Sequence, residues 1–161
     1  MIRILIIFLS LIATNLNANC STNSNYEDLG DGTIKDKSTG LTWMKCPFGM
    51  TWSASGCTGQ SKRTIWRKAI LIANYYNDYD GYADHKNWRL PTLKELESIT
   101  DASCPQLTID QTVFPNTLPT GYWTITEDRN SYAHAMIVYF FHGKSYLSNK
   151  QAEWFVRLVR D

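Results

Sequence analysis

The stretch NWRLPTLKELESI, from Asn87 to Ile99, constrains the fold of this chain more than any other feature. Leu90-Pro91 ends any preceding strand, because proline lacks a backbone N–H for a sheet ladder. Thr92 and Glu95, three residues apart, form the T-x-x-E pattern of a capping box. The sequence therefore predicts a helix that begins at Thr92 or just after it.

The side chains of this junction have a structural interpretation and a functional one. Trp88 and Leu90 alternate as the side chains of a buried edge do, whereas Arg89 points the other way, toward a carboxylate or a helix end. On the structural interpretation a brace is formed by Trp88, Arg89, Leu90, Thr92 and Glu95, with Leu93, Leu96 and Ile99 facing inward. The alternative, Arg89 as a ligand contact, rests on fold analogy alone.

A second helix is predicted upstream, over residues 64–77. Helical spacing is shown there by Trp66, Ala69, Ile70, Ala73 and Tyr76 or Asn77. Leu71 and Ile72 widen the apolar face, which predicts burial on more than one side. Core positions are predicted for Trp43, Trp66, Trp88 and Trp123.

Strands are predicted on both sides of the helical region. A hairpin joins residues 33–36 to residues 41–44 through a turn at residues 37–40. After a Pro- and Asp-bearing loop over residues 101–121, strands are predicted at residues 122–126, 133–140, 145–147 and 155–159. This order is typical of an α+β domain with helices segregated from an antiparallel sheet.

The N-terminal segment MIRILIIFLSLIATNLNANC predicts export. Arg3 precedes an apolar run and a short polar stretch, which is the layout of a secretory signal peptide over residues 1–18. The apolar run is about half of the roughly 20 residues that a membrane span needs. The residues before Cys20 also lack the pattern that lipidation requires. We expect a periplasmic, cell-surface or secreted protein, with a tail over residues 19–27 and one domain over residues 28–161.

Charge and cysteine content narrow the partners and the chemistry. Without residues 1–18 the chain has equal numbers of basic and acidic residues, so no overall charge steers it toward nucleic acid or membrane. Its four cysteines predict two disulfides out of three possible pairings in an oxidising compartment. Cys46 and Cys57 bracket a Gly/Ser-rich loop that a disulfide would close, and Cys20–Cys104 follows by elimination. Neither a C-x-x-C pair nor a nearby histidine supports zinc.

Five stretches resemble, in this order, the Lcl C-terminal domain family, a bacterial secreted domain. They are DLGDGTIKDKSTGLTWMKC, GYADHKNWRLPTLKELESI, VFPN, YWTIT and FVRLVR. The resemblance covers about residues 28 to 160. Each stretch is weak alone, but five in the correct order are specific.

The resemblance implies a shape and a possible class of ligand. The family resembles the C-type lectin fold, and the Trp-Arg-Leu-Pro-Thr helix start is similar to the sulfatase-modifying branch of that fold. This implies two helices packed on a twisted antiparallel sheet, adjacent chain ends, and a long loop region that carries ligand sites. The best-described member is an adhesin whose copy of the domain binds sulfated polysaccharides as a trimer. That adhesin has a collagen-like stalk, whereas no Gly-X-Y repeat occurs here, so trimerisation is not carried over.

The densest positive cluster lies at the start of the first predicted helix. It consists of Lys62, Arg63, Arg67 and Lys68. Sulfate and carboxylate groups pair with such clusters, arginine through bidentate contacts. The alternative is a solvated helix face, although cations near a helix N-terminus oppose the helix dipole. Trp52 and Trp154 are less obviously buried than the other tryptophans and are candidates for stacking on sugar rings.

Calcium and catalysis find little support. Weak calcium ligands are Asp78, Asp80 and Asp84, but an EF-hand loop around Gly81 would begin at Tyr76 and end at Asn87, neither of which is acidic. The Glu-Pro-Asn and Trp-Asn-Asp triplets of calcium-dependent lectins are absent. The histidines, His85, His134 and His142, lack metal-binding spacing, and no serine or cysteine lies in a Gly-x-Ser-x-Gly context.

These observations predict a non-catalytic exported binding module without a cofactor. The first hypothesis is recognition of an anionic, sulfated polysaccharide by the basic cluster with Trp52 or Trp154. The second is a periplasmic or cell-surface domain that docks a protein partner through its loops. No nucleic acid and no membrane span after signal cleavage are expected.

Overall fold

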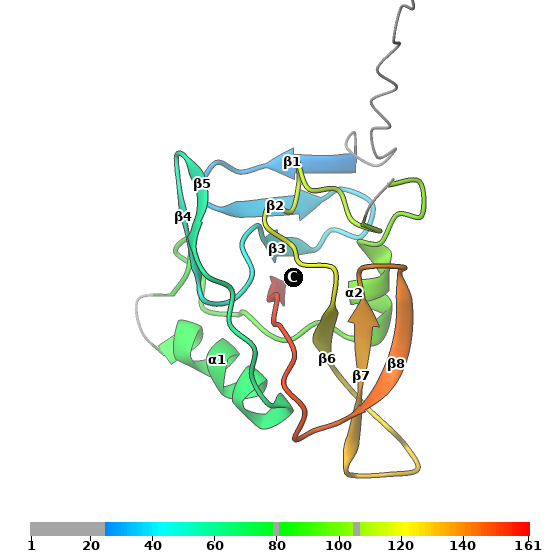
Figure 1. Ribbon diagram of the computed structural model, residues 1–161. Coiled ribbons are helices and arrows are strands. Elements are labelled where there is room, and N and C mark those ends of the chain that lie inside the picture. The colour runs from blue at the N-terminus through cyan, green and yellow to red at the C-terminus, as the bar shows by residue number, and fades with distance from the viewer. Residues whose placement is uncertain (1–24, 79–80, 105–106) are drawn as a thin grey trace, which may run out of the picture.

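The computed structural model describes residues 25–78, 81–104 and 107–161 (Figure 1). Within them, two helices and three antiparallel sheets form an α+β arrangement, where we had expected one antiparallel sheet. The predicted signal peptide, Cys20 and Asp80 lie outside the described residues.

The first sheet joins both ends of the described chain. Its order is β1 (Tyr26–Asp28), β2 (Thr33–Asp36), β3 (Thr42–Met44) and β9 (Val159–Arg160). The predicted hairpin is confirmed as β2 and β3, with Ile34 opposite Trp43. β1 lies partly in the stretch that we had assigned to a tail, so ordered structure begins earlier than predicted.

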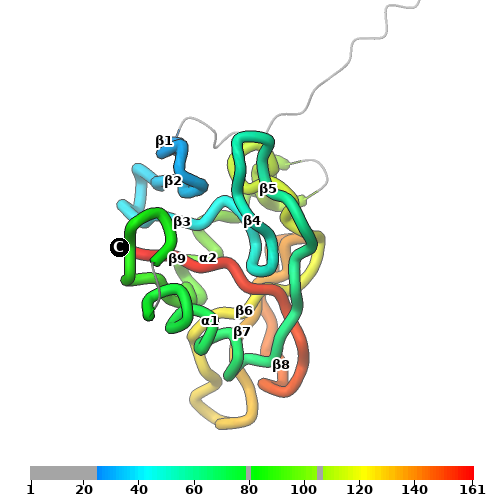
Figure 2. The backbone as a smooth tube through the Cα atoms, turned by 90° about the vertical axis from the view of Figure 1, so that its left-hand side faces the viewer, coloured from blue at the N-terminus to red at the C-terminus, as the bar shows by residue number. Residues whose placement is uncertain are grey.

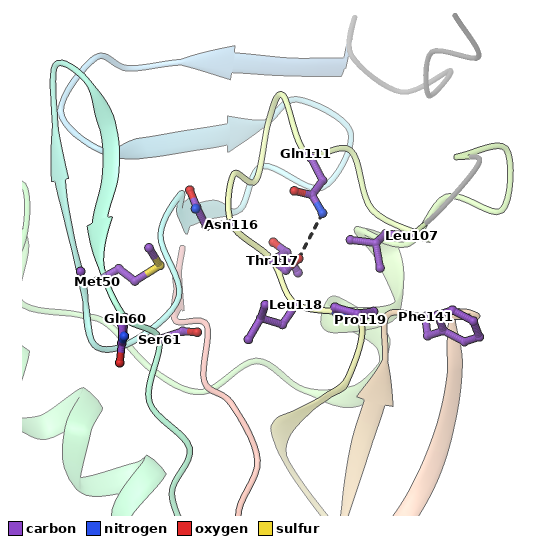
Figure 3. A pocket seen from close by; sticks show the side chains of 11 residues that line it. Met50, Gln60, Ser61, Leu107, Gln111, Asn116, Thr117, Leu118, Pro119 and Phe141 are labelled. Carbon is purple, nitrogen blue, oxygen red and sulfur yellow. Dashed lines mark hydrogen bonds between the residues drawn. The ribbon is translucent and has the colours of Figure 1, made fainter.

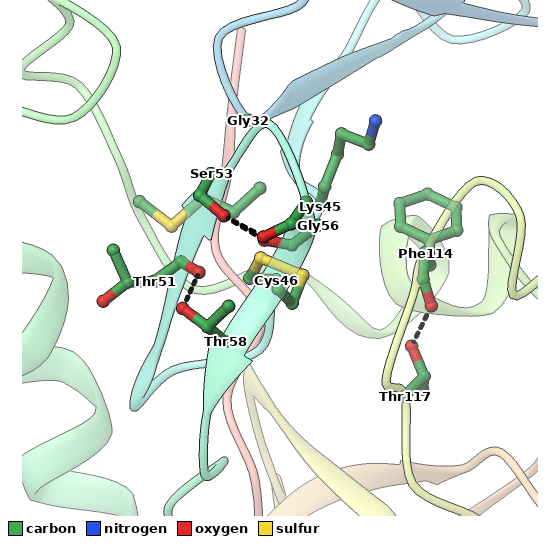
Figure 4. The surroundings of a disulfide bond; sticks show 12 residues. Gly32, Lys45, Cys46, Thr51, Ser53, Gly56, Thr58, Phe114 and Thr117 are labelled. Carbon is green, nitrogen blue, oxygen red and sulfur yellow. Dashed lines mark hydrogen bonds between the residues drawn. A yellow bond between two sulfur atoms is a disulfide. The ribbon is translucent and has the colours of Figure 1, made fainter.

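A second hairpin occupies the segment that we had predicted as a Gly/Ser-rich loop. β4 (Met50–Ser53) pairs with β5 (Gly56–Gly59), and Trp52 lies opposite Cys57. The predicted disulfide between Cys46 and Cys57 is confirmed (Figure 4). The loop prediction was wrong because a two-stranded ladder forms despite weak strand propensity, and the disulfide ties β5 to the chain before β4.

The third sheet is formed by β6 (Gly121–Glu127), β7 (His134–Tyr139) and β8 (Lys144–Asn149), in that order. These strands confirm three of the four predicted in the last third of the chain. A register shift between Trp123 and Glu127 interrupts the pairing of β6 with β7. β8 pairs with β7 alone among the described residues.

The fourth predicted strand, residues 155–159, is mostly wrong. Only its last residue belongs to β9, because the backbone before it changes partner along its length. Phe155 bonds to Gly121 and Trp123 of β6, and Val156 and Leu158 then accept from Phe48 and Met44. The buried C-terminal segment therefore runs from the third sheet to the first (Figure 2).

The two helices are α1 (Trp66–Asp78) and α2 (Leu93–Ser98). Thr92 is the N-cap of α2, and the capping box with Glu95 is present. Thr126 of β6 adds a further cap, since its hydroxyl accepts from the Leu93 N–H at 2.9 Å. The predicted helix start, at Thr92 or just after it, is therefore confirmed.

Arg89 takes the structural role. Its guanidinium donates to both carboxylate oxygens of Glu95, at 2.8 and 3.0 Å, and to Asp161 at 2.7 Å. Burial opposes ionisation of Glu95, but the hydrogen bonds from Arg89 and Thr92 outweigh it and lower the pKa of that carboxyl. Arg89 thus ties the start of α2 to the C-terminus.

Two apolar clusters form the core. Trp43 and Phe114 lie in one, and Trp88 and Trp123 lie in the other. Trp66, expected in the core, is only half-buried and donates its indole N–H to Thr124 O at 2.8 Å. Tryptophan at a core position therefore does not ensure full burial here.

A buried cation lies between the clusters. The Arg157 side chain is 1% exposed and donates to the carbonyls of Met44 and Lys45 and to the hydroxyl of Thr117. Its guanidinium lies 4.9 Å from the centre of the Phe114 ring. Burial lowers the pKa of Arg157 to about 10. No ion pair of Arg157 occurs in the described part of the chain.

Candidate ligand-binding site

A groove of about 490 Å³ lies beside the start of α1, where the chain leaves β5 and enters the helix. We call it the basic groove, and it is lined by Phe48, Lys62, Arg63, Thr64, Lys68, Leu71, Ile72 and Tyr75. Three of the four cations predicted as ligand contacts therefore meet here. No carboxylate belongs to this lining.

Backbone hydrogen bonds on two sides hold the segment that carries Lys62 and Arg63. The Lys62 N–H donates to Phe48 O at 2.9 Å. Thr64 and Trp154 bond to each other through both backbone groups, at 2.9 and 3.1 Å. The cations thus extend from a backbone that is fixed before any ligand binds.

Gly49 allows this segment to pass close to the β4–β5 hairpin. Its φ is +94°, and a Cβ atom there would lie 2.7 Å from both the Gln60 carbonyl oxygen and Lys62 Cγ. A side chain at position 49 is therefore excluded by strain and by contact. The same glycine brings Phe48 to the groove beside Lys62.

The cations of the groove have no counter-charge among the described residues. Lys62, Arg63 and Lys68 are exposed, and none forms an ion pair within the described residues. Lys68 also lies in the first turn of α1, which contains no acidic residue. This arrangement raises the positive potential where a ligand would enter.

The floor of the groove is apolar and partly aromatic. Leu71 is 54% exposed and Tyr75 is 58% exposed, whereas α1 buries Ala69 and Ala73 on its opposite side. Our prediction that Leu71 widens a buried face was therefore wrong. Its side chain instead extends the surface that Lys68 begins, because residues three and four apart share one helix face.

The remaining predicted ligand residues lie elsewhere. Arg67 is exposed on α1 but does not line the groove. Trp52 is half-buried on β4, with the Lys45 ammonium 4.0 Å from its ring centre. Trp154 is half-buried, and its indole N–H donates to the Ser148 hydroxyl at 2.7 Å. Neither tryptophan lines the basic groove, although the backbone of Trp154 pairs with Thr64 at its edge.

The described residues contain no group of three metal-ligating side chains. Asp84 is exposed in a turn with φ of +60°, and Asp78 is exposed at the end of α1. One serine, Ser131, lies 2.9 Å from a histidine nitrogen, that of His134, three residues away in a turn. No described carboxylate pairs with that ring, so a Ser/His/Asp arrangement is not assembled there.

Sequence reasoning missed Phe48, Leu71 and Tyr75 as members of the site. Lys68, Leu71 and Tyr75 follow a spacing of three and four residues, so the stripe was visible once α1 was predicted. Phe48 had no comparable signal, because its place depends on the β4–β5 hairpin.

Comparison with known proteins supports a family assignment. The model of the Lcl C-terminal domain matches residues 32–160. Among curated proteins no match was found. Within the described residues, no helix is long and apolar enough to cross a membrane.

Proposed function

The chain belongs to the Lcl C-terminal domain family, and from that premise we propose that it is a non-catalytic module that binds anionic polysaccharide through the basic groove. The single observation that carries the proposal is the meeting of Lys62, Arg63 and Lys68 over the apolar surface of Leu71 and Tyr75, with no ion pair to these cations in the part of the chain that the structure describes. Sulfate or carboxylate groups would neutralise the cations, and sugar ring faces would cover the apolar floor.

We also propose that the protein is exported and that its fold is C-type-lectin-like. Export is supported by the signal-peptide pattern of residues 1–18 and by the disulfide between Cys46 and Cys57. The fold proposal is supported by β1 and β9, which place the first and last strands in one sheet.

The test measures binding of the full exported chain to dextran sulfate and to unsulfated dextran by titration calorimetry. We expect binding to the sulfated polymer alone, and loss of that binding as salt rises from about 0.1 M to about 1 M, where the Debye length falls from about 10 Å to about 3 Å.

The groove variant carries Lys62→Gln, Arg63→Gln and Lys68→Gln. Exposed ion pairs contribute about 0.2–1 kcal/mol each, so we expect the affinity to fall roughly 3- to 150-fold. The matched control carries Lys37→Gln, Lys86→Gln and Arg129→Gln, three exposed cations outside the groove. Equal loss in both variants would reject the groove as the site.

The exposed apolar floor favours a second candidate, a protein partner docked on the same surface. Its binding would resist salt and would be lost on Leu71→Ser with Tyr75→Ser. Failure of the wild-type chain to bind dextran sulfate would move the search to such a partner.

A further inference from the structure

A second cavity, of about 690 Å³, lies between the β4–β5 hairpin and the loop over residues 107–119 (Figure 3). We call it the amide cavity, after Gln60, Gln111 and Asn116 in its lining. Leu118 and Phe141 form much of its apolar wall. It is larger than the basic groove, and none of the residues considered from the sequence as ligand contacts lines it.

The lining of the amide cavity contains no charged side chain. Gln111 donates one amide hydrogen to Thr117 O at 3.1 Å, and this contact fixes its orientation. The Gln111 carbonyl oxygen and the side chains of Gln60 and Asn116 have no hydrogen-bond partner in the described part of the chain. Amides of this kind offer a donor and an acceptor together, which suits the hydroxyl groups of a neutral sugar.

Phe141 supplies a surface for stacking. Its side chain is 61% exposed at the rim of the cavity, on the connection from β7 to β8. Leu118, 40% exposed, lies on the loop side of the cavity. An exposed aromatic ring and amide side chains in the lining of one cavity suit the apolar face and the polar edge of a sugar ring.

Hydrogen bonds to buried residues hold the loop that forms one wall of the amide cavity. The Thr117 hydroxyl donates to Phe114 O at 2.7 Å and accepts from Arg157 at 2.7 Å. The Leu118 N–H donates to the Tyr122 hydroxyl at 3.1 Å. Because these partners are buried, the wall is formed before binding, and little ordering cost remains for a ligand.

The amide cavity and the basic groove are lined by consecutive residues of one segment. Gln60 and Ser61 line the amide cavity, and the next two residues, Lys62 and Arg63, line the basic groove. Three residues of chain span at most about 11 Å, so Gln60 and Arg63 lie within the reach of a short oligosaccharide. One polymer chain can therefore contact both surfaces.

We infer that the amide cavity binds uncharged sugar residues of the same chain whose acidic groups occupy the basic groove. The inference rests on the proposed function and names its ligand more closely: a polysaccharide in which sulfated or carboxylated positions are accompanied by sugar residues with free hydroxyl groups. Charge selects the polymer at the groove, and sugar structure is recognised at the cavity.

The test compares two polyanions, dextran sulfate with some free hydroxyl groups and poly(vinyl sulfate), which has no sugar ring. The cavity variant of the full exported chain carries Gln60→Ala and Phe141→Ala. Its matched control carries Gln151→Ala and Tyr132→Ala, which remove one exposed amide and one exposed ring elsewhere.

We expect the cavity variant to bind dextran sulfate roughly 5-fold or more weakly, and poly(vinyl sulfate) as the wild type does. The groove variant should weaken binding of both polymers. Unchanged binding of dextran sulfate by the cavity variant, or equal weakening for both polymers, would overturn the inference and leave the proposed function standing. If the cavity variant weakened binding of dextran sulfate but the groove variant did not, the amide cavity would be supported as a sugar site and the basic groove would be rejected as the site of the acidic groups. No binding by the wild type would reject both.

Discussion

The basic groove beside α1 and the frame around β3, β9 and α2 both contain cations, but only the cations of the frame have partners among the described residues. In the frame, Lys45 pairs with Asp28 at 2.6 Å, and Arg89 pairs with Glu95 and Asp161. Arg157 donates to two backbone carbonyls and a hydroxyl. In the groove, the three cations extend into solvent over an apolar floor.

The difference separates charge that supports folding from charge that is available to a ligand. Burying a cation is costly unless hydrogen bonds or counter-charges compensate, and each frame cation has them. A cation in the first turn of a helix opposes the dipole, so Lys68 does not serve the stability of α1. Substitutions in the two regions should therefore differ in their effect on the free energy of unfolding.

The largest effect is expected from Arg157→Met. The change leaves the Met44 and Lys45 carbonyls and the Thr117 hydroxyl without this buried donor. Buried polar groups left unpaired cost about 1–3 kcal/mol each, so we expect a loss of about 3 kcal/mol or more in urea unfolding at pH 7. Arg129→Met, at an exposed position outside both helices, is the control and should change stability by less than about 0.5 kcal/mol. A loss in the free energy of unfolding below about 1 kcal/mol for Arg157→Met would show that Arg157 does not support folding as the other frame cations do.

The next largest loss of stability is expected from removing the disulfide between Cys46 and Cys57, which ties β5 to the chain before β4. Replacing Cys46 and Cys57 by alanine opens a loop with a sequence separation of 11. The chain-entropy relation gives a loss of about 2–3 kcal/mol, measurable by urea unfolding of the oxidised chain. Polymer binding should weaken as well, since Met50 of β4 and Gly59 of β5 line the amide cavity, and Phe48 and Lys62 on either side of the hairpin line the basic groove. Unchanged stability would show that β4 and β5 keep their pairing without the disulfide.

A smaller effect with a definite pH dependence is expected from Glu95→Gln. Because the pKa of Glu95 is lowered in the folded protein, its contribution is present above the unfolded pKa, near 4.3. It is lost as pH falls through the lower folded value. We expect a loss of about 1–2 kcal/mol at pH 7, moderated by the partial exposure of Arg89.

Unfolding of the wild type and Glu95→Gln should be compared between pH 7 and pH 3, with Glu97→Gln on the same helix as the control. The gap between wild type and Glu95→Gln should stay constant from pH 7 to about 5.5 and narrow below about pH 4. A gap that widens toward acid would contradict the assigned direction of the pKa shift.

The sequence predicted those parts of the fold that depend on near neighbours. The start of α2 at Thr92 follows from Pro91 and Glu95 within five residues, and the β2–β3 hairpin follows from its turn. The β4–β5 hairpin escaped prediction because glycine and serine give no strand signal. The segment before β9 was misjudged because its backbone partners, in β6 and at residues 44–48, are remote in sequence.

The candidate site divides in the same way. Local spacing identified Lys62, Arg63 and Lys68, but it also included Arg67, which does not line the groove. Phe48 and the amide cavity required the hairpin, the loop over residues 107–119 and the β7–β8 connection to be brought together. Residues that only the tertiary fold makes adjacent carry no signal in a single sequence.

The smallest expected change in stability is the most informative one for the comparison, and it comes from the groove variant with Lys62, Arg63 and Lys68 replaced by glutamine. None of these cations has an ion pair among the described residues, so their replacement breaks no ion pair there. Replacing Lys68, one of two cations in the first turn of α1, relieves an unfavourable interaction with the helix dipole of about 0.3–1 kcal/mol. We expect urea unfolding to show a free energy of unfolding between that of the wild type and about 1 kcal/mol above it. The variant with Lys37, Lys86 and Arg129 replaced should lack that gain, because none of these lies in the first turn of a helix. A loss above about 1 kcal/mol would place the groove cations with those of the frame, and loss of polymer binding could no longer be assigned to charge alone.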